Sequence, residues 1–199
     1  MTRKLFTRYI LAVLVLTTVA CSGLRFSQLA PEAKDFHPRK VAVFPIEVWN
    51  HKEMTDSRSV VEQMVAGSLV EKKLFDNVMD TENLNRQVSA NEDLRKVMTE
   101  YLSKLRLLNF SDPDLSKKIG ELTKTDAFLL VSVDDWEYFV ERDEKLAKVG
   151  ITMELYDVST GKLMWKAGHT IKNDYMLIKP ELPKIARDVV RKMINYMPH

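Results

Sequence analysis

The second half of the chain contains three consecutive strand-like segments, at residues 126–140, 146–158 and 162–171. The first is apolar throughout over 127–131 and then alternates between apolar and polar residues, and the second alternates along its length. A period of two is typical of β-strands that bury one face. The connections between them are short, a charged loop at 142–145 and a tight turn at 160–161. Because connections this short join antiparallel neighbours, the sequence predicts a three-stranded antiparallel meander.

Most of the remaining sequence shows helical periodicity, with apolar residues spaced three or four positions apart. The last segment is the clearest, because Leu182, Ile185, Val189 and Met193 lie on one stripe. The predicted helices are 56–75, 91–108, 111–122 and 182–197, with a candidate short helix at 81–88 and strands at 40–49 and around Val78. The order β-α-β-α-α-β-β-β-α predicts an α/β fold over residues 40–199. In this fold, helices pack on a mixed sheet that ends in the C-terminal antiparallel meander.

The first twenty residues have the composition of a signal peptide. Arg3, Lys4 and Arg8 form a basic start, an apolar run of about 12 residues follows, and small residues lead to Cys21. A membrane-spanning helix needs roughly 20 apolar residues, so this run is poorly suited to be a permanent anchor. Residues 1–20 are therefore predicted to be removed.

The residues that end at Cys21, the single cysteine of the chain, resemble the bacterial lipobox. In that motif a peptidase cuts before a diacylated cysteine, although Thr18 stands where the motif usually has Leu. The resemblance implies a lipid on Cys21 that anchors the mature chain to a membrane. Ser22, rather than Asp, implies sorting to the outer membrane of a diderm bacterium. The alternative is an ordinary secretory signal followed by a buried cysteine.

Residues 21–39 are predicted to be the lipidated cysteine and a flexible tether, because the segment contains Pro31 and Pro38 and lacks periodicity. A domain on such a tether would face the periplasm, tens of ångströms from the bilayer. Without residues 1–20 the chain has 27 Lys and Arg against 28 Asp and Glu. This near-neutral charge gives no support for nucleic-acid binding.

The sequence contains no recognisable catalytic, cofactor or metal motif. The four histidines lie in four different segments, at His37, His51, His169 and His199. Asp134 and Asp135 are adjacent, and simple strand alternation points them to opposite faces, which does not favour an acid–base pair. We therefore expect no enzyme, no cofactor and no metal site.

Three aromatic residues on the predicted meander allow two interpretations. Trp136, Tyr138 and Trp165 are candidates for a sugar-binding face, because aromatic rings stack on carbohydrate. Aromatic residues at cross-strand spacing more often pack in the core, and we favour that interpretation.

Three sequence motifs resemble a group of bacterial outer-membrane lipoproteins. They are the first strand with Val41, Ala42, Val43 and Pro45, the pair Asp126–Ala127, and the hairpin with Val158, Thr160, Gly161 and Trp165. The group contains the curli secretion channel lipoprotein, the Pel polysaccharide export lipoprotein and the activators of penicillin-binding proteins. The resemblance implies a non-enzymatic accessory subunit of an export or envelope-assembly apparatus, in contact with other envelope proteins and homo-oligomeric.

The curli channel lipoprotein crosses the membrane with long hairpins that this chain does not match. The predicted connection at 141–148 is short and charged, and residues 80–108 have helical periodicity. This difference favours the polysaccharide-export type. The alternative is an activator that contacts a peptidoglycan synthase directly.

Overall fold

The computed structural model describes residues 24–48 and 55–198. Cys21, the predicted signal peptide, His51 and His199 lie outside the described residues. Within the described part of the chain, no helix is long and apolar enough to cross a membrane.

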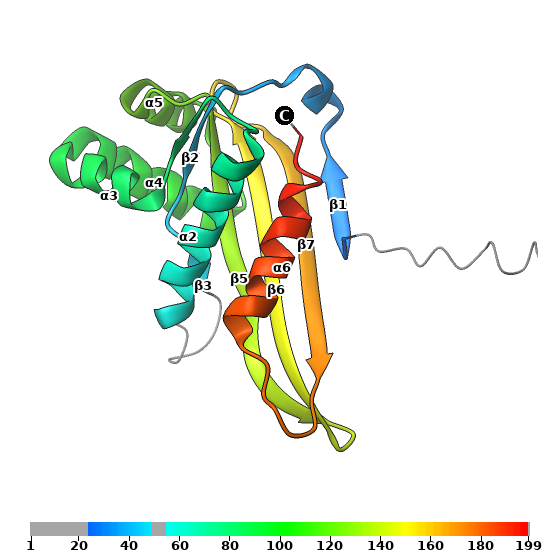
Figure 1. Cartoon of the computed structure of the whole chain (residues 1–199). Helices are drawn as coiled ribbons and strands as arrows, with labels where there is room; N and C mark the ends of the chain where they lie inside the picture. Colours follow the sequence, from blue (N-terminus) through cyan, green and yellow to red (C-terminus); the bar gives the residue numbers. More distant parts are fainter. Residues whose placement is uncertain (1–23, 49–54, 199) are drawn as a thin grey trace, which may run out of the picture.

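A single mixed sheet forms the centre of the molecule (Figure 1). Its strands are β1 (Phe26–Leu29), β2 (Lys40–Val43), β3 (Glu47–Val48), β4 (Asn77–Met79), β5 (Ala127–Glu141), β6 (Glu144–Asp157) and β7 (Leu163–Asp174). The order is β1-β7-β6-β5-β2-β4, and β3 pairs with β5 below β2. Strand β2 runs parallel to both β4 and β5, and β3 runs parallel to β5. The pairs β5–β6, β6–β7 and β7–β1 are antiparallel. The predicted mixed sheet and antiparallel meander are confirmed.

The helices are η1 (Pro31–Asp35), α2 (Thr55–Lys72), α3 (Thr81–Ala90), α4 (Glu92–Leu108), α5 (Pro113–Thr123) and α6 (Leu182–Ile194). Local sequence determines where three of them begin. Asp80, Asn91 and Asp112 each accept a hydrogen bond from a backbone N–H of the first turn of α3, α4 and α5. The candidate helix at 81–88 is present as α3, so the element order has one more α-helix than predicted, in addition to η1, β1 and β3.

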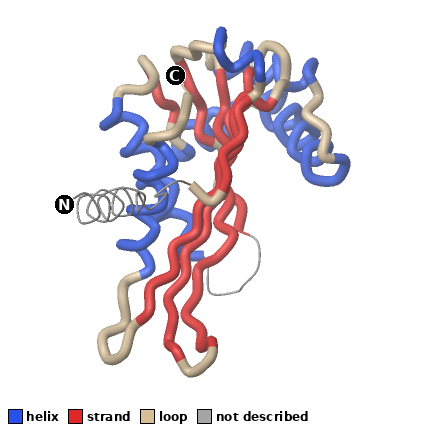
Figure 2. Tube along the Cα trace, turned by 90° about the vertical axis from the view of Figure 1, so that its right-hand side faces the viewer, coloured by secondary structure: helices blue, strands red, loops and turns tan. Residues whose placement is uncertain are grey.

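The two faces of the sheet are covered differently (Figure 2). Helices α2 and α6 cover one face over most of its height, with Val65, Leu129, Ile151 and Val189 among the buried residues of this core. Helices α3, α4 and α5 cover only the upper part of the other face. The core there is aromatic, with Phe128 stacked between Phe44 and Tyr156 at ring-centroid distances of 4.7 and 5.2 Å.

The predicted tether over residues 22–39 is wrong for its larger part. Residues 26–29 form β1 on the edge of β7, and Trp165 donates a hydrogen bond from Nε1 to Ser27 Oγ at 3.1 Å. Residues 31–35 form η1, where Glu32 pairs with Lys162 at 2.7 Å. The folded unit therefore includes Leu24, and its first strand lies well before Lys40.

The predicted loop at 142–145 is a two-residue turn instead. Arg142 and Asp143 both have positive φ, at 50° and 68°, and Glu141 pairs directly with Glu144. This geometry is typical of tight hairpins whose twist matches that of the strands. Strand β5 consequently extends to Glu141, and β6 begins at Glu144, two residues earlier than the sequence predicts. The two strands form a ribbon that extends below α3, α4 and α5 (Figure 1).

Candidate functional site

The lower part of the β5–β6–β7 ribbon has one face without a covering helix, here called the open face (Figure 2). A bulge in β5 determines which residues lie on it, because the register with β6 shifts between Val133 and Asp135. Above the bulge Val131 and Val133 belong to the core beneath α2 and α6. Below it, Trp136 and Tyr138 pack against that core. The alternation has therefore changed by one residue.

Asp134 and Asp135 both lie on the open face because of this bulge, so the prediction of opposite faces is wrong. Asp134 accepts hydrogen bonds from Thr152 Oγ1 at 2.7 Å and from Ser132 Oγ at 3.2 Å. Asp135 pairs with Lys148 Nζ at 2.5 Å, and both side chains of this pair are about one-fifth exposed. Each carboxylate therefore has its own hydrogen-bond or ion-pair partners. This arrangement indicates a structural role for the two residues and not an acid–base pair.

Gly150 makes room for Asp135 on the open face. A Cβ built at this glycine would collide with the Asp135 carboxylate and would lie 3.0 Å from Thr170 Oγ1. Gly150 therefore lets the Asp135 side chain lie against the backbone of β6, within reach of Lys148.

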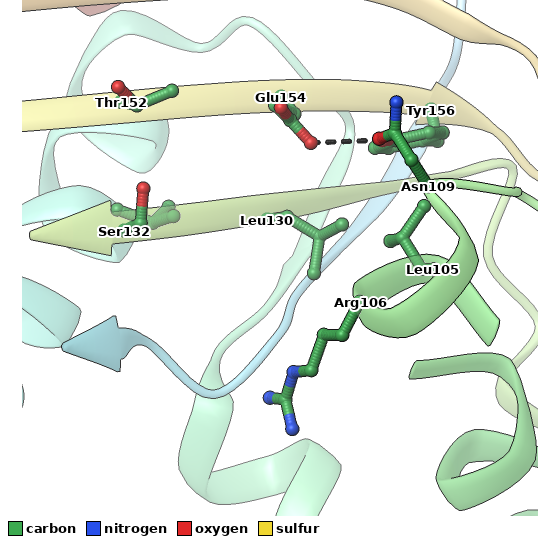
Figure 3. Close-up of a pocket in the computed structure, with 9 residues that line it drawn as sticks. Leu105, Arg106, Asn109, Leu130, Ser132, Thr152, Glu154 and Tyr156 are labelled. Carbon is green, nitrogen blue, oxygen red and sulfur yellow. Dashed lines mark hydrogen bonds between the residues drawn. The ribbon is translucent and has the colours of Figure 1, made fainter. Parts of the chain in front are cut away.

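A groove of about 280 Å³ lies where the end of α4 meets the open face (Figure 3). Leu105, Arg106 and Asn109 line its helical side, and Thr152 and Glu154 are among the residues that line its sheet side. Burial raises the pKa of Tyr156, whose hydroxyl donates a hydrogen bond to Glu154 at 2.9 Å. Three exposed apolar side chains lie at or just after the end of α4, at Leu107, Leu108 and Phe110.

The loop from Tyr175 to Glu181, here called the distal loop, is the second exposed apolar feature. Met176, Leu177 and Ile178 are 86–96% exposed. Tyr138 holds both ends of the loop, because its ring meets Tyr175 edge-on at 6.1 Å and its hydroxyl donates to Pro180 O at 2.7 Å. The loop lies at the lower end of the ribbon, beside the β5–β6 turn (Figure 1). It therefore presents three apolar side chains from an anchored base.

The aromatic residues on the meander belong mainly to the core. Trp165 is 1% exposed, so a sugar-binding role for this residue is wrong. Trp136 and Tyr138 are partly buried and pack against the core on the α6 side, away from the open face.

The histidines show no clustering in the described part of the chain. His37 is exposed, and no group of three or more His, Cys, Asp or Glu residues among the described positions could hold a metal ion. His169 is partly buried between β7 and α6, and its Nδ1 has no hydrogen-bond partner among the described residues. Burial lowers the pKa of His169, and the nearby Lys192 lowers it further.

Two of the surface features were not predicted from sequence. The distal loop does have a signal, three consecutive apolar residues between the charged Asp174 and Lys179 where no strand or helix continues. The open face depends on the bulge at Asp134, which no turn or glycine residue marks in the sequence.

Comparisons with known proteins identify solved structures with the same fold. Neither protein-family models nor curated proteins match the chain. Among solved structures, the PelC dodecamer of Paraburkholderia phytofirmans is similar, with a TM-score of 0.53 and 20% identity over 85% of this chain and 92% of PelC. The chain has the PelC fold.

Two further structures share this fold. Lipoprotein GNA1162 of Neisseria meningitidis has a TM-score of 0.50 and 14% identity, over 80% of this chain and all of the other. The hypothetical protein CT253 of Chlamydia trachomatis has a TM-score of 0.52 and 7% identity, over 79% of this chain and 94% of the other. The predicted resemblance to the group that contains PelC is thus confirmed at the level of the fold.

Proposed function

We propose that the protein is a non-enzymatic lipoprotein of the outer membrane that faces the periplasm as a homo-oligomeric, accessory subunit of an export or envelope-assembly apparatus. The observation that carries this proposal is the fold shared with PelC, which was solved as a dodecamer, on a chain whose N-terminus has a lipobox-like Cys21. The cysteine would carry the lipid, and the domain would supply contacts to neighbouring subunits and to other envelope proteins.

The start of the folded unit supports a membrane-proximal domain. Leu24 is three residues after Cys21, so the two Cα atoms are at most about 11 Å apart. Strand β1 runs antiparallel to β7, with Phe26 opposite Gly168 and Leu29 opposite Trp165. The chain therefore enters β1 at the end of the strand that points toward the distal loop. A lipid on Cys21 and the distal loop would approach the bilayer from the same end of the molecule.

The distal loop fits this orientation. Met176, Leu177 and Ile178 together expose a large apolar area to solvent. Moving such side chains into the membrane interface is favourable by about 1 kcal/mol each when they are partly buried. We infer that the loop touches the bilayer that holds the lipid, and that it fixes the orientation of the ribbon.

The predicted lipid anchor on Cys21 can be tested by following the processing and membrane sorting of the full chain. In a diderm bacterium we expect a mature N-terminus at Cys21 with covalently bound acyl chains by mass spectrometry, and co-fractionation with the outer membrane. Cys21→Ser should remain unprocessed. The matched variant Ser22→Asp should keep the lipid and move to the inner membrane. An unmodified mature N-terminus in the wild type would contradict the proposal.

Light scattering on residues 22–199, which contain the whole described unit, tests the assembly. The proposal predicts a discrete oligomer much larger than a monomer. A monomer that binds a penicillin-binding protein would instead favour activation of a peptidoglycan synthase.

A further inference from the structure

The lower halves of β5 and β7 are open edges of the sheet. The outer side of β5 pairs with β2 and β3, and these pairs end at Val133. The outer side of β7 pairs with β1 only over residues 165–168. Below these points, residues 134–141 and 169–174 pair with β6 alone, and no other described strand covers their outer sides (Figure 1).

Open edges of this length are unusual in a protein that acts alone. An edge strand presents a row of unpaired N–H and C=O groups, which readily pair with another strand. Here the two open edges lie on opposite sides of one three-stranded ribbon and at the same height. Strands β5 and β7 also run in the same direction, because each is antiparallel to β6.

The two edges differ in charge. The open part of β5 contains Asp134, Asp135, Glu137 and Glu141 and no Lys or Arg. The β7 side carries Lys172, and Arg25 lies beside it with Nη1 3.4 Å from Thr170 Oγ1. Within one copy Lys172 already reaches toward Glu141 across β6, at 3.8 Å. Asp174 at the tip is the one acidic side chain on residues 169–174 of β7. The open part of β5 is therefore acidic, although Lys148 on β6 pairs with Asp135. The β7 side carries the two cations Lys172 and Arg25 against the single carboxylate of Asp174.

We propose that the β5 edge of one copy pairs with the β7 edge of a second copy of this chain, as a parallel strand pair. Such a contact uses two different surfaces, so it repeats from copy to copy and closes into a ring when the rotation permits. It would place Lys172 of one copy beside the carboxylates of the next and satisfy the open backbone groups of both strands. This inference deepens the homo-oligomer of the proposed function and rests on it.

Engineered cysteines test the pairing directly. Residues 22–199 contain no cysteine, so every thiol can be introduced by design. Neighbouring strands lie about 4.8 Å apart, which is within the Cα separation that a disulfide spans. Glu137→Cys or Phe139→Cys, each combined with Thr170→Cys or Lys172→Cys, covers adjacent registers. In at least one double variant, mild oxidation should give a ladder of cross-linked oligomers that disappears on reduction.

The single variants are the matched controls. Glu137→Cys or Lys172→Cys alone should give no disulfide-linked species, because each copy then contributes a thiol to only one side of the contact. An equimolar mixture of the two should give dimers and nothing larger. Cross-linking of a single variant with itself would overturn the proposal, since it would indicate an isologous contact between identical edges.

Charge reversal separates this inference from the proposed function. The double variant Glu137→Lys/Glu141→Lys should weaken assembly at least tenfold by light scattering, and adding Lys172→Glu should restore it. Near-identical circular dichroism and thermal unfolding of both variants would show that they fold. If the wild type is an oligomer but none of the double-cysteine variants cross-links, the edge pairing is wrong and the proposed oligomer stands. If the wild type is a monomer at all concentrations, both fail.

Discussion

Two glycines in helices differ in the space available for a larger side chain. Gly67 in α2 has no atom within 4 Å of the position that a Cβ would occupy, whereas a Cβ at Gly120 in α5 would collide with Val158 Cγ1. Alanine is about 1 kcal/mol better than glycine in a helix interior, so Gly67→Ala should raise the free energy of unfolding by about 0.5–1 kcal/mol. Gly120→Ala should lower it by about 1–2 kcal/mol, because α5 must move away from the β6–β7 turn.

Urea unfolding followed by circular dichroism measures both changes, and each variant serves as the control for the other. Stabilisation by Gly120→Ala would contradict the close packing of α5 on Val158.

His169 makes stability depend on pH. Its pKa is lowered in the folded protein by burial and by Lys192, whereas in the unfolded chain a histidine titrates near pH 6.5. As the pH falls through about 6.5, the unfolded chain therefore takes up a proton that the folded protein accepts less readily. The free energy of unfolding decreases accordingly. His169→Gln should flatten this decrease between about pH 6.5 and 5.

Urea unfolding at several pH values tests this expectation. His37→Gln, at an exposed side chain on another segment, is the control and should keep the wild-type dependence. An unchanged pH dependence in His169→Gln would show that His169 does not cause it.

At the scale of elements, the sequence predicts the helices and strands that are marked by a pattern within a few neighbouring residues. The stripe of α6 and the alternation of β6 are each readable within a few residues. The parallel neighbours β2 and β5 also carry a local signal in residues 41–43 and 127–131, because strand segments buried on both faces are apolar at consecutive positions.

The missed elements depend on contacts made elsewhere in the chain. Strand β1 is mostly exposed and shows no apolar alternation, and only its position on the edge of β7 makes it a strand. The turn at Arg142–Asp143 adopts positive φ without a glycine or asparagine, so the usual signal of a tight hairpin is absent. The open face also depends on the bulge at Asp134, which is why sequence reasoning expected Asp134 and Asp135 on opposite faces.

At the scale of the whole molecule, the start of β1 and the distal loop determine which end would face the bilayer in the proposed function. A protein that consists of residues 22–199, with a label on a single introduced cysteine, tests this orientation in the absence of the lipid. Leu177→Cys, carrying an environment-sensitive nitrobenzoxadiazole group, should show a blue-shifted and stronger emission on vesicles of phosphatidylethanolamine and phosphatidylglycerol. The control Leu107→Cys lies at the end of α4 and is 79% exposed, and its label should not respond to vesicles.

Replacing the three apolar side chains separates membrane contact by the loop from contact by the rest of the surface. Met176→Ser, Leu177→Ser and Ile178→Ser together should weaken vesicle binding roughly 100-fold, which corresponds to about 3 kcal/mol of lost apolar transfer. The fold should be unaffected, because Tyr138 still holds Tyr175 and Pro180 at the base of the loop. Equal vesicle binding by the wild type and the triple variant would contradict this orientation, and a response at Leu107→Cys alone would place the end of α4 against the bilayer instead.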